Sequence, residues 1–174
     1  MSEMEERALS PLRLPRWNEL PDLEIYMDQV LSLLSRYLRE LPGLDAKGLT
    51  ASMVNNYVKQ GVLPPPVGKR YTRTHLGCLI VITILKSVLP IGSIGRIIAW
   101  ELSSGKPHGE LYDRFCRAYE TTSQAASAAA PGAEEETEID RDIFRAALRS
   151  QAEQAAALRM LGRLPAPEPA PRKR

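Results

Sequence analysis

The sequence predicts an all-α protein, on the strength of three observations. Apolar residues recur at helical spacing in several separate segments of the 174-residue chain. The segment from Leu76 to Leu89 is apolar on nearly all sides, as expected for a helix at the centre of a core. The short segment 62 to 71, with its prolines and glycine, has the composition of a rigid extended turn between two helices.

The length and the composition shifts divide the chain into five parts. A chain of this size holds one domain of about 100 to 130 residues plus tails. Repeated prolines mark an arm that Trp17 anchors. An Ala/Ser-rich, then acidic stretch marks a linker, although its alanines could extend the preceding helix. We expect an arm over residues 1 to 21, a helical domain over 22 to 120, a linker over 121 to 137, a C-terminal helix over 138 to 163 and a disordered tail over 164 to 174.

Within the helical domain, apolar periodicity and capping residues predict five helices. The first spans residues 22 to 41 and ends at Pro42-Gly43. Thr50 caps the second, over residues 51 to 60, which stops at Gly61. The remaining three helices are expected over residues 72 to 89, 91 to 102 and 110 to 120.

Several classes of protein are disfavoured. Cys78 and Cys116 lie far apart without metal-ligand spacing, so we expect two reduced, buried thiols and neither metal nor cofactor. The Glu-rich start lacks the features of a signal peptide. The longest apolar stretch is interrupted by polar residues and is shorter than the ~20 residues that cross a bilayer. These features predict a cytoplasmic protein without a membrane-spanning segment.

The charges are unevenly distributed along the chain. The 55 residues between Asp45 and Glu101 contain no acidic residue and seven basic ones, whereas the rest of the chain carries a net charge of −5. A polyanionic partner is the simplest explanation for such a basic window. We therefore expect residues 46 to 75 to form the most positive surface, with no local carboxylate to neutralise it.

The predicted helix over residues 51 to 60 has one wholly polar face. Its four polar side chains follow the spacing i, i+3, i+4 and i+7 and are Ser52, Asn55, Asn56 and Lys59. An Asn amide can bond the N6 and N7 edge of adenine, and Lys and Ser can reach guanine or phosphate. The competing interpretation is an ordinary amphipathic surface helix, which also has a polar face.

Basic residues follow this helix in the chain. Three consecutive prolines, 64 to 66, and Gly68 predict a rigid segment that turns back on itself and could act as a wing. Lys69 and Arg70 lie at its tip or returning strand, and Arg73 lies in the first turn of the next helix, where the helix dipole disfavours a cation. A nearby phosphate would compensate, although a loop Lys-Arg pair is commonly just solvated.

Four short segments carry a resemblance to a known bacterial family: residues 26 to 30 (YMDQV), 54 to 59 (VNNYVK), 69 to 71 (KRY) and 85 to 86 (LK). Over roughly residues 10 to 120, the chain resembles the domain-of-unknown-function family DUF1836.

The segment from 49 to 98 also resembles MerR-type regulators, through Tyr57, Gly61-Val62-Leu63, Arg70-Tyr71 and Thr72. This second resemblance implies a MerR-like winged helix-turn-helix core with additional N- and C-terminal helices. It assigns the recognition-helix role to the polar face of helix 51 to 60 and the wing role to Lys69 and Arg70. The long helix before this core, and the absence of a long coiled coil and of effector-binding cysteines, leave dimer geometry and any effector open.

The function expected from these features is binding of double-stranded DNA, as a transcriptional regulator and as a homodimer. The alternative is a non-enzymatic adaptor whose basic region meets an acidic protein partner. We expect no enzyme, because His75 and His108 have no nucleophile or carboxylate constellation and no Gly-rich phosphate loop occurs. Asp22, Glu24 and Asp28 are expected to stabilise a helix start rather than to bind metal.

Overall fold

The computed structural model describes residues 13–39, 41, 48–128 and 139–165. In these residues the chain forms six α-helices, one 3-10 turn and two isolated β-bridges, so the all-α prediction is confirmed for the described part. The elements are η1 (Trp17–Glu19), α2 (Met27–Leu38), α3 (Ala51–Lys59), α4 (Arg73–Leu85), α5 (Ile91–Ser103), α6 (His108–Ala128) and α7 (Ile139–Leu161). Residues 1 to 12 of the expected arm, 129 to 138, and 166 to 174 of the expected tail lie outside the described residues.

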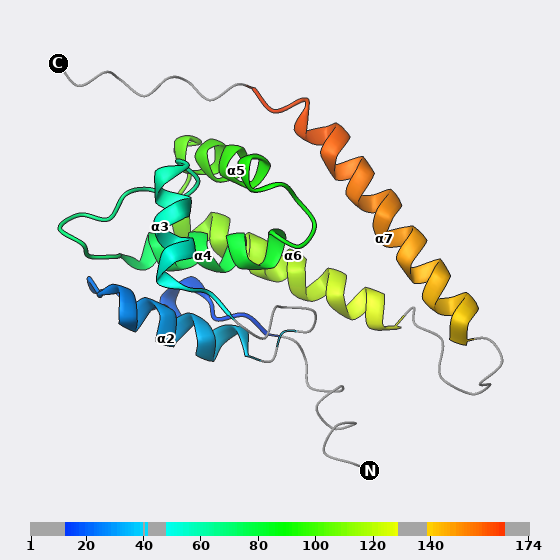
Figure 1. Cartoon of the computed structure of the whole chain (residues 1–174), viewed down its shortest axis with the longest axis horizontal. Coiled ribbons are helices and arrows are strands. Elements are labelled where there is room, and N and C mark those ends of the chain that lie inside the picture. Colours follow the sequence, from blue (N-terminus) through cyan, green and yellow to red (C-terminus); the bar gives the residue numbers. More distant parts are fainter. Residues whose placement is uncertain (1–12, 40, 42–47, 129–138, 166–174) are drawn as a thin grey trace, which may run out of the picture.

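Helix α4 is the centre of the core, as its composition predicts. It contacts α2, α5 and α6, while α3 packs on α2 (Figure 1). Leu76, Leu79 and Ile80 of α4 are fully buried. A helix that is apolar on nearly all sides is stable only when other elements cover it all round. No helix among the described residues has both the length and the apolar character that a membrane-spanning segment requires.

Helix α2 begins later than expected, at Met27 instead of residue 22. The reason is non-local: Ile25 is extended and forms an antiparallel bridge with Tyr71, so the chain before α2 cannot be helical. Tyr26 is the N-cap, and its backbone N–H donates to the Gln29 side chain at 2.9 Å. Leu23, which lies within the expected helix, precedes α2 and is 60% exposed.

Several further helix ends differ from the expectation. Helix α2 ends at Leu38 instead of residue 41, and α6 begins at His108 instead of residue 110. Helix α4 stops at Leu85, and the chain turns through residues 86 to 88 before Pro90 opens α5. Helix α6 continues to Ala128, where a linker from residue 121 was expected. The Ala-rich composition of this extension explains the difference, because alanine has the highest helix propensity. Cys78 and Cys116 are buried free thiols, as predicted.

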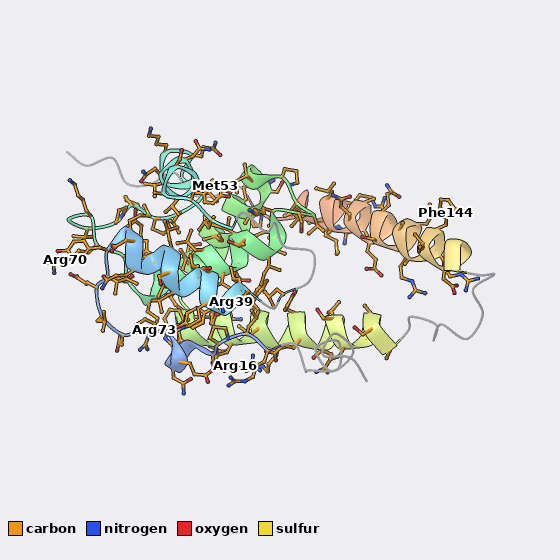
Figure 2. The ribbon with its side chains drawn as sticks, turned by 60° about the horizontal axis from the view of Figure 1, so that its bottom comes forward. Arg16, Arg39, Met53, Arg70, Arg73 and Phe144 are labelled. Carbon is orange, nitrogen blue, oxygen red and sulfur yellow. The ribbon has the colours of Figure 1, made fainter. Side chains whose placement is uncertain are left out.

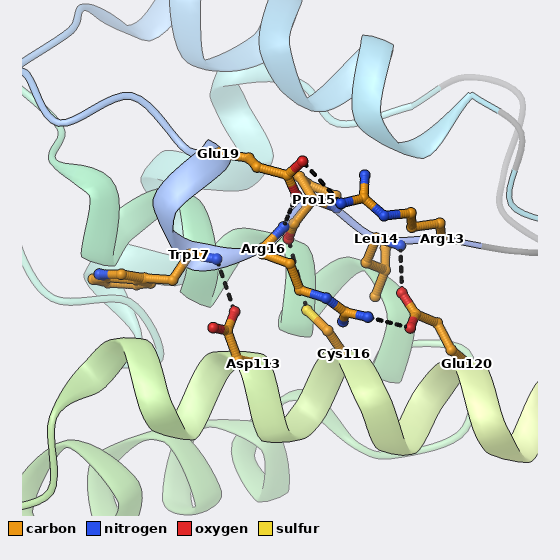
Figure 3. A network of polar contacts seen from close by, with 9 residues as sticks. All are labelled: Arg13, Leu14, Pro15, Arg16, Trp17, Glu19, Asp113, Cys116 and Glu120. Atoms are coloured by element: carbon orange, nitrogen blue, oxygen red, sulfur yellow. Dashed lines mark hydrogen bonds and ion pairs between the residues drawn. The ribbon is translucent and has the colours of Figure 1, made fainter.

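The arm before α2 lies along α6 and is held there by a polar network (Figure 3). Glu120 accepts a hydrogen bond from the Leu14 backbone N–H at 2.9 Å and another from the Arg16 guanidinium at 2.6 Å. The backbone N–H of Trp17 donates to Asp113 at 2.7 Å. Two carboxylates of α6, Asp113 and Glu120, therefore fix the backbone of the arm.

Helix α7 packs on the core only through its C-terminal half. Arg96 of α5 donates to the carbonyl oxygens of Leu161 and Leu164, at 3.3 and 3.1 Å. This positive charge also interacts favourably with the partial negative charge at the C-terminal end of the α7 dipole. Gln154 donates to the Val88 carbonyl at 2.6 Å. The N-terminal half extends past the core (Figure 1), so Ile143, on the same helical face as Gln154, is 62% exposed.

Candidate nucleic-acid interface

Helix α3 is defined at both ends by local interactions that the sequence predicted. The Thr50 hydroxyl accepts the Met53 backbone N–H at 3.2 Å at the N-terminus. At the C-terminus Gly61 has a φ of +69°, and the N–H groups of Gly61 and Val62 donate to the carbonyls of Val58 and Tyr57 at 3.0 and 2.9 Å. This is the Schellman pattern, which ends a helix at a left-handed residue. The helix lies within one residue of its predicted bounds.

The two faces of α3 are distributed as the sequence predicted. Val54 is fully buried and Tyr57 is 7% exposed, so these side chains attach the helix to the core. Four polar side chains are exposed on the outer face: Ser52, Asn55, Asn56 and Lys59. Together with Met53 they line one shallow surface depression. We call this surface the α3 polar face.

Met53 was not among the predicted site residues. Its side chain is half-buried and borders the same depression as the polar groups (Figure 2). Apolar side chains next to polar ones are among the groups that can contact the methyl group of thymine in a major groove. The sequence does not identify Met53 as a site residue. It lies between the outward-facing Ser52 and the inward-facing Val54, and this position does not show which way its side chain points.

The segment between α3 and α4 ends in a tight turn at Gly68-Lys69. Arg70 N–H donates to the Val67 carbonyl at 3.0 Å, and both central residues have positive φ, +56° at Gly68 and +63° at Lys69. Positive φ at both positions is the signature of a type I′ turn. Lys69 is the one non-glycine residue with positive φ in the described part, and it is exposed at the tip of the turn. A lysine held in this unfavourable conformation is an observation that points to function rather than to stability.

The expectation that no carboxylate lies near these cations is wrong. Arg70 forms an ion pair with Glu24 at 3.2 Å and lies 5.7 Å from the centre of the Tyr26 ring. Both partners come from the segment before α2, which the Ile25–Tyr71 bridge brings alongside the turn. Each side chain of the pair is about half exposed, 51% and 54%, and such exposed pairs contribute little to stability because water screens them. Arg70 can therefore exchange Glu24 for another anion at small cost.

Arg73 is engaged more deeply than predicted. Its side chain is 19% exposed, approaches Asp22 at 3.6 Å and lies over the Trp17 ring, 5.7 Å from the ring centre. These contacts, rather than an external phosphate, offset the unfavourable helix dipole at the start of α4. Figure 2 shows Arg70 and Arg73 toward the end of the molecule where the α3–α4 segment projects. Of the seven predicted site residues, Arg73 is the least accessible to a ligand.

Thr72 and His75 join the turn to the core. The backbone N–H of Thr72 donates to Nδ1 of His75 at 3.0 Å, which satisfies one of the free amides at the start of α4. The other ring nitrogen, Nε2, is buried and has no hydrogen-bond partner among the described residues. Burial lowers the pKa of the His75 imidazole below its ordinary value, and the carbonyls of Pro65 and Pro64 partly oppose this effect. The His75 ring is therefore neutral where it accepts the Thr72 N–H at the start of α4, close to Pro64 and Pro65.

The comparisons with known proteins concern the same part of the chain. Residues 15–119 match a family described as a domain of unknown function, DUF1836. The chain belongs to this family. The match begins in the arm, includes α2 through α5 and most of the packed part of α6, and leaves out α7. No curated protein matches the chain significantly. No solved structure does so either.

Proposed function

We propose that this DUF1836 protein is a DNA-binding transcriptional regulator with a MerR-like winged helix-turn-helix. In this proposal α3 enters the major groove and the turn at Gly68-Lys69 acts as the wing on the neighbouring phosphates. The observation that carries the proposal is the α3 polar face, in which two adjacent asparagines lie between a serine and a lysine on an exposed surface that no described acidic residue lines. Paired hydrogen-bond donors and acceptors of this kind can read base edges.

Three exposed cations, one on this face and two in the turn before α4, support the same function. Lys59 ends α3 and Lys69 is at the tip of the turn, and neither forms an ion pair with a described residue. Arg70 adds a third cation that is held only by an exposed pair. Contacts of such residues to phosphate orient a protein on the duplex without reading its sequence.

We further propose that the protein binds DNA as a homodimer. A nine-residue helix contacts only a few base pairs, and two copies related by a twofold axis double the specific contacts. The N-terminal half of α7 leaves Ile143, Phe144 and Leu148 exposed. A second copy of the same helix would cover them.

A different class of function is favoured by one observation. Arg70 and Arg73 are both paired with carboxylates of the same chain, as expected if this region meets an acidic protein surface by exchanging carboxylates. In that case the protein is a non-enzymatic adaptor on a reused scaffold. We favour DNA because side-chain amides, rather than further cations, occupy the centre of the α3 polar face.

The decisive experiment is a fluorescence-anisotropy titration of the full chain against a random duplex pool and duplexes enriched from it by repeated selection. We expect micromolar or tighter binding to the random pool, with the logarithm of affinity falling linearly with the logarithm of salt concentration. Selected duplexes should bind at least about a thousandfold more tightly. Absence of enrichment over successive rounds, or affinity that does not depend on salt, would refute DNA recognition and favour the adaptor.

A further inference from the structure

A cavity of about 300 Å³ lies between α4, α5 and α6, against the arm that carries Trp17. Its lining is mostly apolar, with Val81, Leu85 and Ile98 among the contributing side chains. Small-molecule sites in proteins have volumes of about 300 to 1,000 Å³ and combine an apolar lining with a few polar groups. The volume here is suited to a ligand of one or two rings.

One wall of the cavity is aromatic, and its rings pack against the backbone of α4 and α6 at two glycines. Trp17 and Tyr112 lie with ring centres 5.9 Å apart, and Phe115 lines the same space. A Cβ on Gly109 would lie 2.6 Å from Trp17, and one on Gly77 would lie 3.2 Å from Tyr112. The two glycines therefore let the rings rest against α4 and α6. A fixed wall of this kind favours planar aromatic ligands, which stack or pack edge-to-face on it.

The polar groups of the cavity decide the charge of the ligand. Arg114 donates to both carboxylate oxygens of Glu101, at 2.8 and 3.0 Å, and His108 lies 3.3 Å from the Thr74 hydroxyl. Because Arg114 and Glu101 neutralise each other, a ligand carboxylate must compete with Glu101 for the guanidinium. A hydroxyl or amide can donate to Glu101 while the ion pair stays intact.

We propose that this cavity binds a small, neutral, planar aromatic molecule whose single hydroxyl or amide group meets the Glu101–Arg114 pair. Trp17 faces the cavity and also carries the Arg73 guanidinium over its ring. Arg73 opens α4, directly after the wing-like turn. A ligand packed against Trp17 therefore stabilises the position of Arg73 at the start of α4, and with it the turn that precedes α4, which strengthens DNA binding through that turn. This regulatory part rests on the proposed function, whereas ligand binding itself does not.

The binding test uses 2-naphthol as the probe and the full-length, ¹⁵N-labelled chain. The protein has two tryptophans, and the Trp100→Phe variant assigns their indole N–H resonances. We expect saturable shifts of the Trp17 resonance, while that of Trp100, which does not line the cavity, stays in place. Shifts of both resonances to the same extent, or none at Trp17, would overturn the site.

A cavity-filling variant with a matched control locates the probe. Ala118 lines the cavity yet is exposed on α6, so Ala118→Phe can fill the entrance without disturbing the core. Ala125 is an exposed alanine of the same helix outside the cavity. We expect Ala118→Phe to weaken 2-naphthol at least about tenfold and Ala125→Phe to leave it unchanged. Equal binding by the two variants contradicts the cavity, and tighter binding of 2-naphthoate than of 2-naphthol contradicts the neutral ligand class.

The regulatory part is tested by titrating selected DNA with and without saturating 2-naphthol. We expect about fivefold tighter DNA binding with the probe, and by linkage the same factor in the affinity of the probe when DNA is present. An unchanged or weakened DNA affinity would refute the coupling through Trp17. The ligand site itself is tested separately, by the shifts of the Trp17 and Trp100 resonances. If the chain binds no DNA, the proposed function fails and the cavity is judged by the resonance and variant data alone.

Discussion

Ile25 and Tyr71 exchange both of their backbone hydrogen bonds, with N–H to carbonyl distances of 2.9 and 2.8 Å. This single antiparallel bridge joins the segment before α2 to the returning side of the Gly68-Lys69 turn. It places Glu24 beside Arg70 and Asp22 beside Arg73, although each pair is separated by about fifty residues in the chain. The electrostatics of the proposed DNA-binding surface therefore depend on a segment outside the acid-free window.

Removing the carboxylate that holds Arg70 should strengthen DNA binding. We expect Glu24→Gln to raise DNA affinity about threefold at low salt and to steepen its salt dependence. In the wild type Arg70 must break its ion pair with Glu24 before it contacts a phosphate, and in the variant it need not. Asp28→Asn is the matched control, since it makes the same change in net charge at an exposed position of α2. Equal gains in the two variants would show that only net charge matters and that the Arg70–Glu24 pair has no part.

Lys69 should show opposite effects on stability and on binding. We expect Lys69→Gly to raise the free energy of unfolding by about 0.5 to 1 kcal/mol, because glycine adopts the φ of +63° without the steric cost of a side chain. The same variant should reduce the slope of the salt dependence of DNA binding by about one unit. Urea denaturation and anisotropy measure the two effects.

Lys69→Ala separates the two causes, because it removes the charge and keeps the unfavourable conformation. It should bind DNA as weakly as Lys69→Gly without any gain in stability. A destabilised Lys69→Gly would show that the turn does not have positive φ at this position.

The asparagines of α3 should determine sequence preference. We expect Asn55→Ala and Asn56→Ala each to cost about 1 to 3 kcal/mol in binding to the selected duplex and little in binding to the random pool. Both side chains are exposed, so folding should be unaffected. Ser35→Ala, at an exposed position of α2, serves as the control. The base-reading role would be untenable if both variants selected the same sequences as the wild type.

The stability of the protein should decrease below about pH 6.5 because of His75. Its folded-state pKa is lowered by burial, so the unfolded chain binds the proton more readily, and stability falls as the pH drops below the ordinary pKa of about 6.5. His75→Gln removes the titratable imidazole and keeps a side chain that can accept the hydrogen bond from the Thr72 backbone N–H. Its free energy of unfolding should vary less between pH 7.5 and 5 than that of the wild type.

His108→Gln is the control for this measurement, since His108 is exposed on α6. It should retain the pH dependence of the wild type. The same pH dependence in His75→Gln as in His108→Gln would assign the effect to other groups.

The exposed apolar residues of α7 should form the dimer contact. We expect the double variant Phe144→Glu and Leu148→Glu to sediment as a monomer at micromolar concentration, while the wild type sediments as a dimer. Arg149→Glu changes an exposed residue of the same helix without removing apolar surface and should leave the dimer intact. Because Gln154 and Leu161 already contact the core, deleting the chain after Thr137 would also disturb the folded domain. A monomeric wild type, with or without DNA, would refute the dimer.

The last helix shows a limit of reasoning from apolar spacing. Ile143, Gln154 and Leu161 share one helical face in the sequence. In the structure Gln154 and Leu161 contact the core, whereas Ile143 lies beyond its edge. Periodicity identifies a face of a helix, but it does not show how far along that face a partner extends.

The sequence by itself determined the features that depend on neighbours within a few residues. These are the all-α class, the bounds of α3 from Thr50 to Gly61 and the separation of its polar and buried faces, because caps and helical spacing act over one or two turns. Tertiary structure alone decided the late start of α2, the carboxylate partners of Arg70 and Arg73, and the cavity between α4, α5 and α6. These features arise where distant segments meet, and the path that brings Ile25 to Tyr71 leaves no periodic pattern in either segment.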